Sequence, residues 1–139
     1  MGAVGVHVRL TNGADEFLVR TGQLRPADVR SYEGEALVDT GSMLLCIPEH
    51  VAIQLKLETA EEREVTIADG STRLCKYVGP VEIRFDGRTC YAGALVLGDR
   101  VLLGAVPMED MDLVINPLTR TVQANPKSPN IPSTIVMSA

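Results

Sequence analysis

The stretch Leu37-Val38-Asp39-Thr40-Gly41-Ser42 carries the strongest signal in this sequence. An apolar, strand-like run leads into one acidic residue, and the glycine two positions later leaves little bulk around the carboxylate. Two hydroxyl residues flank that glycine. Such a turn can aim a carboxylate, so Asp39 is the first candidate for chemistry. The alternative is that Asp39 only starts a turn, with its side chain bonded to its own backbone.

Short strands are predicted on both sides of this turn. Apolar residues alternate from Val4 to Leu10, Asn12-Gly13 is a turn signal, and residues 16–19 would return, which predicts an N-terminal hairpin. Asp69-Gly70 and Asp86-Gly87 are typical of two further hairpin turns. Strands are expected at residues 34–38, 43–47, 64–67, 73–78, 81–85, 89–92, 94–97, 101–103, 113–115 and 121–123.

Helical signals are few. Pro48 can open a helix, with Ile47, Val51 and Leu55 at helical spacing, and Pro107 can open one turn of helix through Met111. Residues 24–32 predict a short helical turn or a connector. Many short strands and little helix indicate an all-β domain, closed or sandwiched. We expect one domain at residues 1–125, followed at residues 126–139 by a Pro-rich tail that could add a terminal strand at 135–137.

Composition excludes several classes of function. The chain has 139 residues, a net charge of -5, three tyrosines and two phenylalanines, and its basic residues are scattered, so nucleic acid is not an expected partner. No run is long enough to span a membrane. The start Met1-Gly2-Ala3-Val4-Gly5-Val6 lacks the basic residues and long apolar core of a signal peptide, and Val6 stands where a myristoylation signal has Ser or Thr. Three cysteines without C-x-x-C spacing favour a reducing cytoplasm. Cys46 and His50 would share a helix face, but no second ligand pair accompanies them, so no metal site is expected.

The order of these parts resembles the retropepsin-like (clan AA) aspartic proteases. Residues 37–42 are similar to the catalytic turn of that family. Ile67-Ala68-Asp69-Gly70-Ser71 lies where the family has its flap, the hairpin that covers substrate. Val101-Leu102-Leu103-Gly104-Ala105 is similar to the second signature, a strand that packs beside the catalytic turn. Leu24-Arg25-Pro26 and the Pro-rich residues 125–130 are similar to segments of the small bacterial and archaeal single-domain members.

This resemblance implies a small closed acid-protease barrel with one or two short helices, working as a two-fold homodimer on peptide or protein substrates without a cofactor. One Asp39 from each subunit would activate the attacking water, because the chain has no second Asp-Thr-Gly or Asp-Ser-Gly. The residues that the resemblance assigns to the site are Asp39 as the catalytic residue, Thr40, Gly41 and Ser42 around it, Ala68, Asp69, Gly70 and Ser71 in the flap, and Leu102, Leu103 and Gly104 in the second signature strand. Val106 departs from the family, in which many members have Asp or Asn at this position.

Two other functions fit parts of the pattern. A dimeric peptide-binding module could keep this fold without catalysis. An aspartyl-phosphate enzyme could use a similar string, but the phosphatases of the haloacid dehalogenase type need a second acid where this chain has Gly41, and no parallel α/β pattern accompanies the motif.

Overall fold

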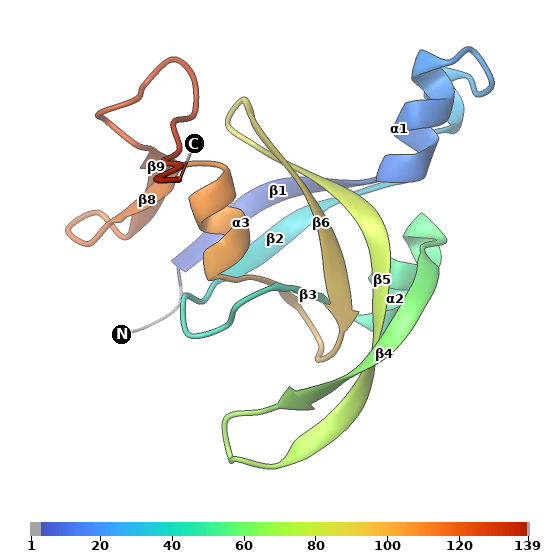
Figure 1. Cartoon of the computed structure of the whole chain (residues 1–139), viewed down its shortest axis with the longest axis horizontal. Helices are drawn as coiled ribbons and strands as arrows, with labels where there is room; N and C mark the ends of the chain where they lie inside the picture. The colour runs from blue at the N-terminus through green and yellow to red at the C-terminus, as the bar shows by residue number, and fades with distance from the viewer. Residues whose placement is uncertain (1–3, 139) are drawn as a thin grey trace.

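The computed structural model describes residues 4–138 and shows an all-β architecture with three short α-helices (Figure 1). Of the six residues on which the N-terminal targeting prediction rests, the first three lie outside the described part. Among the described residues no helix is long and apolar enough to cross a membrane. The elements in chain order are β1 (Val4–Asn12), α1 (Gly13–Arg20), the 3-10 turn η1 (Pro26–Asp28), β2 (Ser31–Val38), β3 (Leu45–Ile47), α2 (Glu49–Leu55), β4 (Glu58–Thr66), β5 (Thr72–Phe85), β6 (Arg88–Val96), β7 (Val101–Leu103), α3 (Ala105–Asp110), β8 (Leu113–Asn116) and β9 (Thr121–Ala124).

Six strands close into a barrel. The hydrogen-bonded order is β1-β2-β7-β3-β6-β5-β4, and β1 also pairs with β5, so the ring runs from β1 to β5 and back. Closure comes from an antiparallel register in which Leu10 lies opposite Ile83. In this sheet only β4 stands outside the ring, paired to β5 alone among the described strands. The expected all-β closed barrel is therefore confirmed.

The barrel is filled by aliphatic side chains that the alternation of the strands turns inward. Leu10, Leu45, Ile47, Ile83 and Leu103 are fully buried there. Burial of each such side chain contributes about 1.5 to 3 kcal/mol, so the interior alone explains why the ring closes. Helix α2 packs on the barrel through Val51 and Leu55, the residues whose spacing predicted a helix.

The predicted N-terminal hairpin is wrong. Residues 13–20 form helix α1, because Asn12 acts as its N-cap and accepts hydrogen bonds from the backbone N–H groups of Ala14 (2.9 Å) and Asp15 (3.1 Å). The Asn-Gly pair that signalled a turn is thus a helix start. Arg30 fixes the helix by donating to the buried carboxylate of Asp15. This helix brings the number of α-helices to three, one more than the largest number expected.

Three other predictions change in the structure. Gly79-Pro80 does not separate two strands, since β5 runs through it with a shift of register between Val78 and Val81. The runs 89–92 and 94–97 are one strand, β6, which ends at Val96. Cys46 lies in β3 and His50 in α2, so they do not share a helix face. In the first two cases a continuous ladder of backbone hydrogen bonds prevails over a predicted break in the strand, and in the third the helix begins only after Pro48.

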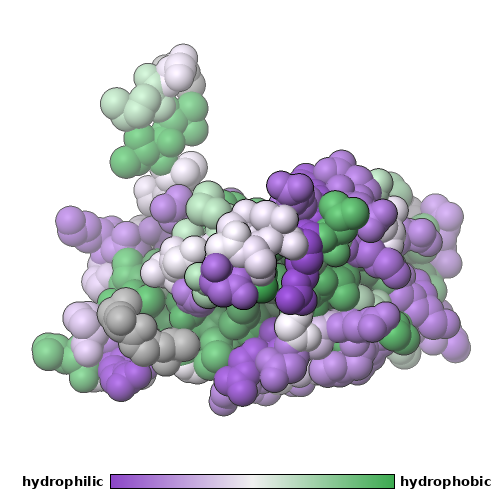
Figure 2. Space-filling model, turned by 90° about the horizontal axis from the view of Figure 1, so that it is seen from below, coloured by the Kyte–Doolittle hydropathy of each residue, from purple (hydrophilic) through white to green (hydrophobic). Residues whose placement is uncertain are grey.

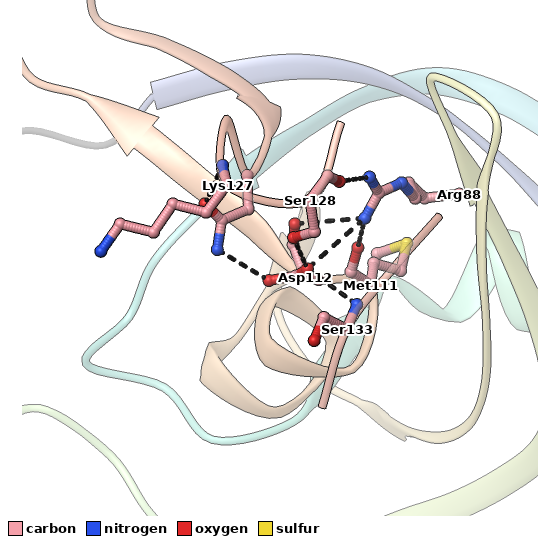
Figure 3. Close-up of polar contacts among 7 residues, drawn as sticks. Arg88, Met111, Asp112, Lys127, Ser128 and Ser133 are labelled. Carbon is pink, nitrogen blue, oxygen red and sulfur yellow. Dashed lines mark hydrogen bonds and ion pairs between the residues drawn. The ribbon is translucent and has the colours of Figure 1, made fainter. Parts of the chain in front are cut away.

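The chain after β9 is tied to the body by Asp112 (Figure 3). The Asp112 carboxylate accepts from the Ser128 hydroxyl, the Ser133 N–H (2.9 Å) and the Asn125 amide (3.1 Å). Buried Arg88 reaches the same place and donates to the Met111 carbonyl at 3.0 Å and to the Ser128 carbonyl. These bonds lower the pKa of Asp112, the Ser128 hydroxyl most of all.

Residues 125–138 contain no helix or strand. The apolar residues Ile135, Val136 and Met137 are exposed, and Figure 2 shows the end of the chain projecting from the body with a hydrophobic surface. After Ser133, whose N–H bonds to Asp112, burial of side chains therefore does not hold this segment in place.

Candidate functional site

The Asp39 turn follows directly from the end of β2. Ala36 and Val38 of that strand are buried, and the next residue, Asp39, is exposed. The Asp39 N–H donates to the Leu103 carbonyl at 3.0 Å, which continues the parallel pairing of β2 with β7 by one bond. The barrel thus holds the backbone of Asp39 while its side chain leaves the core.

Two local donors orient the Asp39 carboxylate. One oxygen accepts the Gly41 N–H at 3.0 Å, and the other accepts the Ser42 hydroxyl at 3.3 Å. A Cβ on residue 41 would lie 3.2 Å from the first oxygen, which explains why glycine suits this position. Thr40 is exposed beside them, and its side chain makes no hydrogen bond within the described residues. Asp39 therefore has an exposed carboxylate that Gly41 and Ser42 hold in place, and the roles predicted for residues 39–42 remain predictions.

The predicted second signature lies against this turn. Leu102 of β7 lies opposite Leu37 and Leu103 opposite Val38. A Cβ on Gly104 would come within 2.5 Å of the Leu44 carbonyl oxygen, so only glycine allows this approach of two backbones. The next two N–H groups, of Ala105 and Val106, donate to the carbonyls of Ser42 (2.8 Å) and Met43 (2.9 Å).

Val106 therefore takes part in the site through its backbone. Its side chain is exposed and presents an apolar surface. The bonds between α3 and the Asp39 loop that the structure shows at this residue come from the main chain.

The predicted flap is the turn between β4 and β5. Asp69 accepts from the Ser71 N–H (2.8 Å) and hydroxyl (2.6 Å), and Gly70 has a φ of +85° that suits glycine. The two bonds from Ser71, the hydroxyl's first, hold the pKa of Asp69 below its usual range. Figure 1 shows the hairpin running beyond the rest of the sheet to this turn. Of the four flap residues predicted, Ala68 reaches the cavity described next, whereas Asp69, Gly70 and Ser71 stand at the tip.

A cleft of about 800 Å³ opens between the Asp39 turn and the β4–β5 hairpin. Apolar side chains form much of its wall, and they belong to a hydrophobic cluster separate from the barrel core. The lining residues are Asp39, Gly41, Ser42, Met43, Leu44, Cys46, Arg63, Glu64, Val65, Thr66, Ile67, Ala68, Leu95, Leu97 and Leu102. A volume of this size lies within the usual range of ligand-binding pockets.

Sequence reasoning missed the wall of this cleft. Cys46, Val65, Leu95 and Leu97 come from strands that the sequence predicted only as buried or paired, and their convergence depends on how the barrel curves. Burial raises the pKa of the Cys46 thiol, with smaller contributions from Cys75 and Asp39. A weakly ionised thiol is a poor nucleophile, so Cys46 serves as part of the wall.

A second hollow, of about 520 Å³, lies between α2 and the outer side of the same hairpin. Ala52, Ile53, Leu74 and Val78 are among its lining residues, and Asp39 is not. The Asp39 carboxylate, held by Gly41 and Ser42, therefore lines the larger of these two hollows.

Comparison with known proteins finds likenesses among solved structures. No family model and no curated protein sequence matches this chain. Among solved structures the chain is similar to one titled "Solution structure of Simian Foamy Virus (mac) protease", with 14% identity and a TM-score of 0.46. The match covers 77% of this chain and 91% of the viral one. Fold and site together define a single closed β-barrel that presents one framed carboxylate at the mouth of a cleft, and its function has to be argued from that geometry.

Proposed function

We propose that this protein is an aspartic-type endopeptidase of the retropepsin-like kind, similar to the small bacterial and archaeal single-domain members, and that it works as a homodimer. One observation carries the proposal. The Asp39 carboxylate is held from two sides, by the Gly41 N–H and the Ser42 hydroxyl, at the mouth of a cleft of about 800 Å³ that the β4–β5 hairpin borders.

The second carboxylate would come from a second copy of the chain. Among the residues that line the cleft, the other acid is Glu64 on β4, and strand alternation turns its side chain away from the face that Val65 occupies. Asp39 is exposed in the single chain, as a residue at a subunit contact would be. A two-fold axis beside Asp39 would bring the same group of both subunits together, with Thr40 placed to bond across the axis.

The chemistry of such a pair follows from its charge. Two carboxylates about 3 Å apart would repel by roughly 5 kcal/mol if both were ionised, at an effective dielectric of about 20. One proton therefore stays on the pair. The ionised member takes a proton from water as the water attacks the peptide carbonyl, and the protonated member donates to the oxygen on which negative charge develops. Ser42 and Gly41 keep both carboxylates in position from outside.

The test uses Asp39→Asn and a matched control. Asp86→Asn changes another exposed turn aspartate, which does not line the cleft, and Asn tolerates its positive φ of 47°. We expect Asp39→Asn to lose cleavage of a mixed peptide library at acidic to neutral pH, with unchanged circular dichroism, while Asp86→Asn keeps it. Full activity of Asp39→Asn would remove Asp39 from the mechanism.

A dilution series tests the shared site. Specific activity should fall as the enzyme is diluted through the dissociation constant of the dimer, because half a site has no partner carboxylate. Constant specific activity in a sample that ultracentrifugation shows to be monomeric would contradict the dimer. Peptide binding without any cleavage by the unaltered protein would favour the dimeric peptide-binding module instead.

The cysteines support a cytoplasmic location. Cys46, Cys75 and Cys90 are all buried free thiols, and burial raises the pKa of Cys90 to about 12, so this thiol stays protonated. Unpaired buried thiols suit a reducing compartment.

A further inference from the structure

Among the described residues that line the cleft, Arg63 is the one cation. It lies in β4 opposite Cys75 of β5, and cross-strand partners share a face of the sheet. Cys75 and Val65 belong to the apolar cluster beneath the cleft, so Arg63 is on the inner face of the hairpin. Its charge is therefore placed beside the space that a peptide would fill.

The Arg63 guanidinium rests on a built platform. Its Cζ lies 3.6 Å from the centroid of the Tyr77 ring. The ring in turn lies against Gly93 of β6, where an added Cβ would come within 2.1 Å of the ring. Any larger residue at position 93 would displace Tyr77. This three-layer stack of Gly93, Tyr77 and Arg63 holds the guanidinium plane in one orientation before a ligand arrives.

One edge of the guanidinium is free. The Arg63 Nε donates to Glu61 at 2.9 Å, whereas neither Nη atom makes a hydrogen bond within the described residues. The side chain keeps 41% of its surface exposed. The two Nη groups present the parallel N–H donors that match the two oxygens of a carboxylate. Glu61 occupies the other edge, so it orients the group and leaves the fork available.

We propose that Arg63 determines substrate specificity by binding a carboxylate of the peptide, at a position removed from the bond that is cut. This inference rests on the proposed function, since it assigns a recognition role to the same cleft. The carboxylate can come from an acidic side chain or from the C-terminus of a short peptide. The apolar wall receives the neighbouring side chains, and the Arg63 fork selects for the acid.

The test compares peptides that differ in one residue. A fluorogenic apolar peptide that the protein cleaves is made with Glu, Gln or Lys at each position in turn, with free and amidated C-termini. At one position we expect kcat/KM to be about tenfold higher for Glu than for Gln, the effect of one charge-assisted, partly exposed contact. If kcat/KM is instead higher for peptides with a free C-terminus than for amidated ones, and no internal position prefers Glu, then Arg63 binds the C-terminal carboxylate.

Variants tie the preference to Arg63. Arg63→Gln should bring the Glu-to-Gln ratio close to 1, and Arg63→Lys should leave it intermediate because the fork is lost but the charge remains. Tyr77→Leu keeps the charge without the platform and should also give an intermediate ratio. Lys76→Gln removes a cation from the outer face of the same hairpin, opposite Glu62, and should leave the ratio unchanged.

Two results would overturn the inference. One is a kcat/KM that is equal for acidic and neutral peptides at every position and either terminus, and the other is a preference that survives in Arg63→Gln. If the protein cleaves no peptide, the proposed function fails, and the same ratio is then measured as dissociation constants by fluorescence anisotropy. A tenfold tighter binding of the acidic peptides that Arg63→Gln abolishes would still support the role of Arg63, and equal binding would refute it.

Discussion

Replacing Gly104 with alanine tests the contact on which the geometry of the Asp39 turn depends. The added Cβ would lie 2.5 Å from the Leu44 oxygen, 2.6 Å from the Met43 carbonyl carbon and 2.7 Å from the Ser42 oxygen. All three are backbone atoms, so no side chain can rotate away. Either residues 42–44 or the start of α3 must move.

The expected cost can be worked from these contacts. Overpacking against fixed atoms costs about 1 to 3 kcal/mol. Movement of the loop also weakens the bonds from Ala105 and Val106 to Ser42 and Met43, each contributing about 1 kcal/mol. Alanine also stabilises the folded state by about 0.5 kcal/mol, because it has fewer conformations than glycine in the unfolded chain. We therefore expect Gly104→Ala to lower the free energy of unfolding by about 2 to 3 kcal/mol, or the melting temperature by about 8 to 12 °C for a chain of this size.

Urea titration followed by circular dichroism measures this loss, with the protein concentration held constant because a dimer links stability to concentration. Gly5→Ala is the matched control, since its Cβ would meet only the movable end of the Glu35 side chain at 3.3 Å, and it should change stability by less than about 0.5 kcal/mol. A melting temperature of Gly104→Ala equal to that of Gly5→Ala would refute the reasoning.

Two further predictions concern buried and half-buried carboxylates. Asp15→Asn should lower the free energy of unfolding, measured by urea titration, by about 2 to 3 kcal/mol, because it removes the charge that Arg30 bonds at 2.6 and 2.8 Å. The control Asp28→Asn breaks an exposed pair with Arg25 and should lower it by less than about 0.5 kcal/mol. The Arg30 hydrogen bond lowers the pKa of Asp15, so this stabilisation is present above the ordinary carboxyl pKa of about 4 and should be lost as the pH falls through the lowered value; a stability that is flat below pH 4 would contradict it. Asp112→Asn should make residues 125–133 exchange amide hydrogens faster and be cut sooner by added trypsin at Lys127, and unchanged protection of that segment would show that Asp112 does not anchor it.

Much of the site could be predicted because its parts are local in sequence. The Asp39 turn and the Asp69-Gly70 turn each depend on a glycine whose need is visible within a few residues, whereas Gly104 is needed because of residues 42–44, which are distant in sequence. The packing of the Gly104 strand beside the Asp39 turn followed from the resemblance to a family and not from the residues alone. A parallel pairing such as β2 with β7, which joins positions 65 residues apart from 38 to 103, leaves no local trace.

The failures have a common physical cause. At Asn12-Gly13 and at Gly79-Pro80 the local signals for a turn are real, but the final structure is decided by partners distant in sequence. Asp15 holds the new helix through Arg30, and β5 continues past Pro80 because β1 pairs with its second half at residues 81–84. The packing of Arg63 on Tyr77 could not be predicted from the sequence for the same reason, since Tyr77 and Gly93 belong to two other strands.

Because β4 lies outside the closed ring, opening of the β4–β5 hairpin and opening of the barrel should differ in free energy. Opening the ring means breaking the register between β1 and β5, which is a global event, whereas β4 has one bonded neighbour among the described strands. Local opening at the free side of a sheet has a lower free energy than global unfolding. Native-state hydrogen exchange should therefore resolve two cooperative units in one small domain: a slow unit in the barrel strands, and a fast one in the hairpin that borders the cleft. Under the proposed function, such opening of the hairpin would let a peptide enter and leave the cleft while the barrel still holds the Asp39 carboxylate.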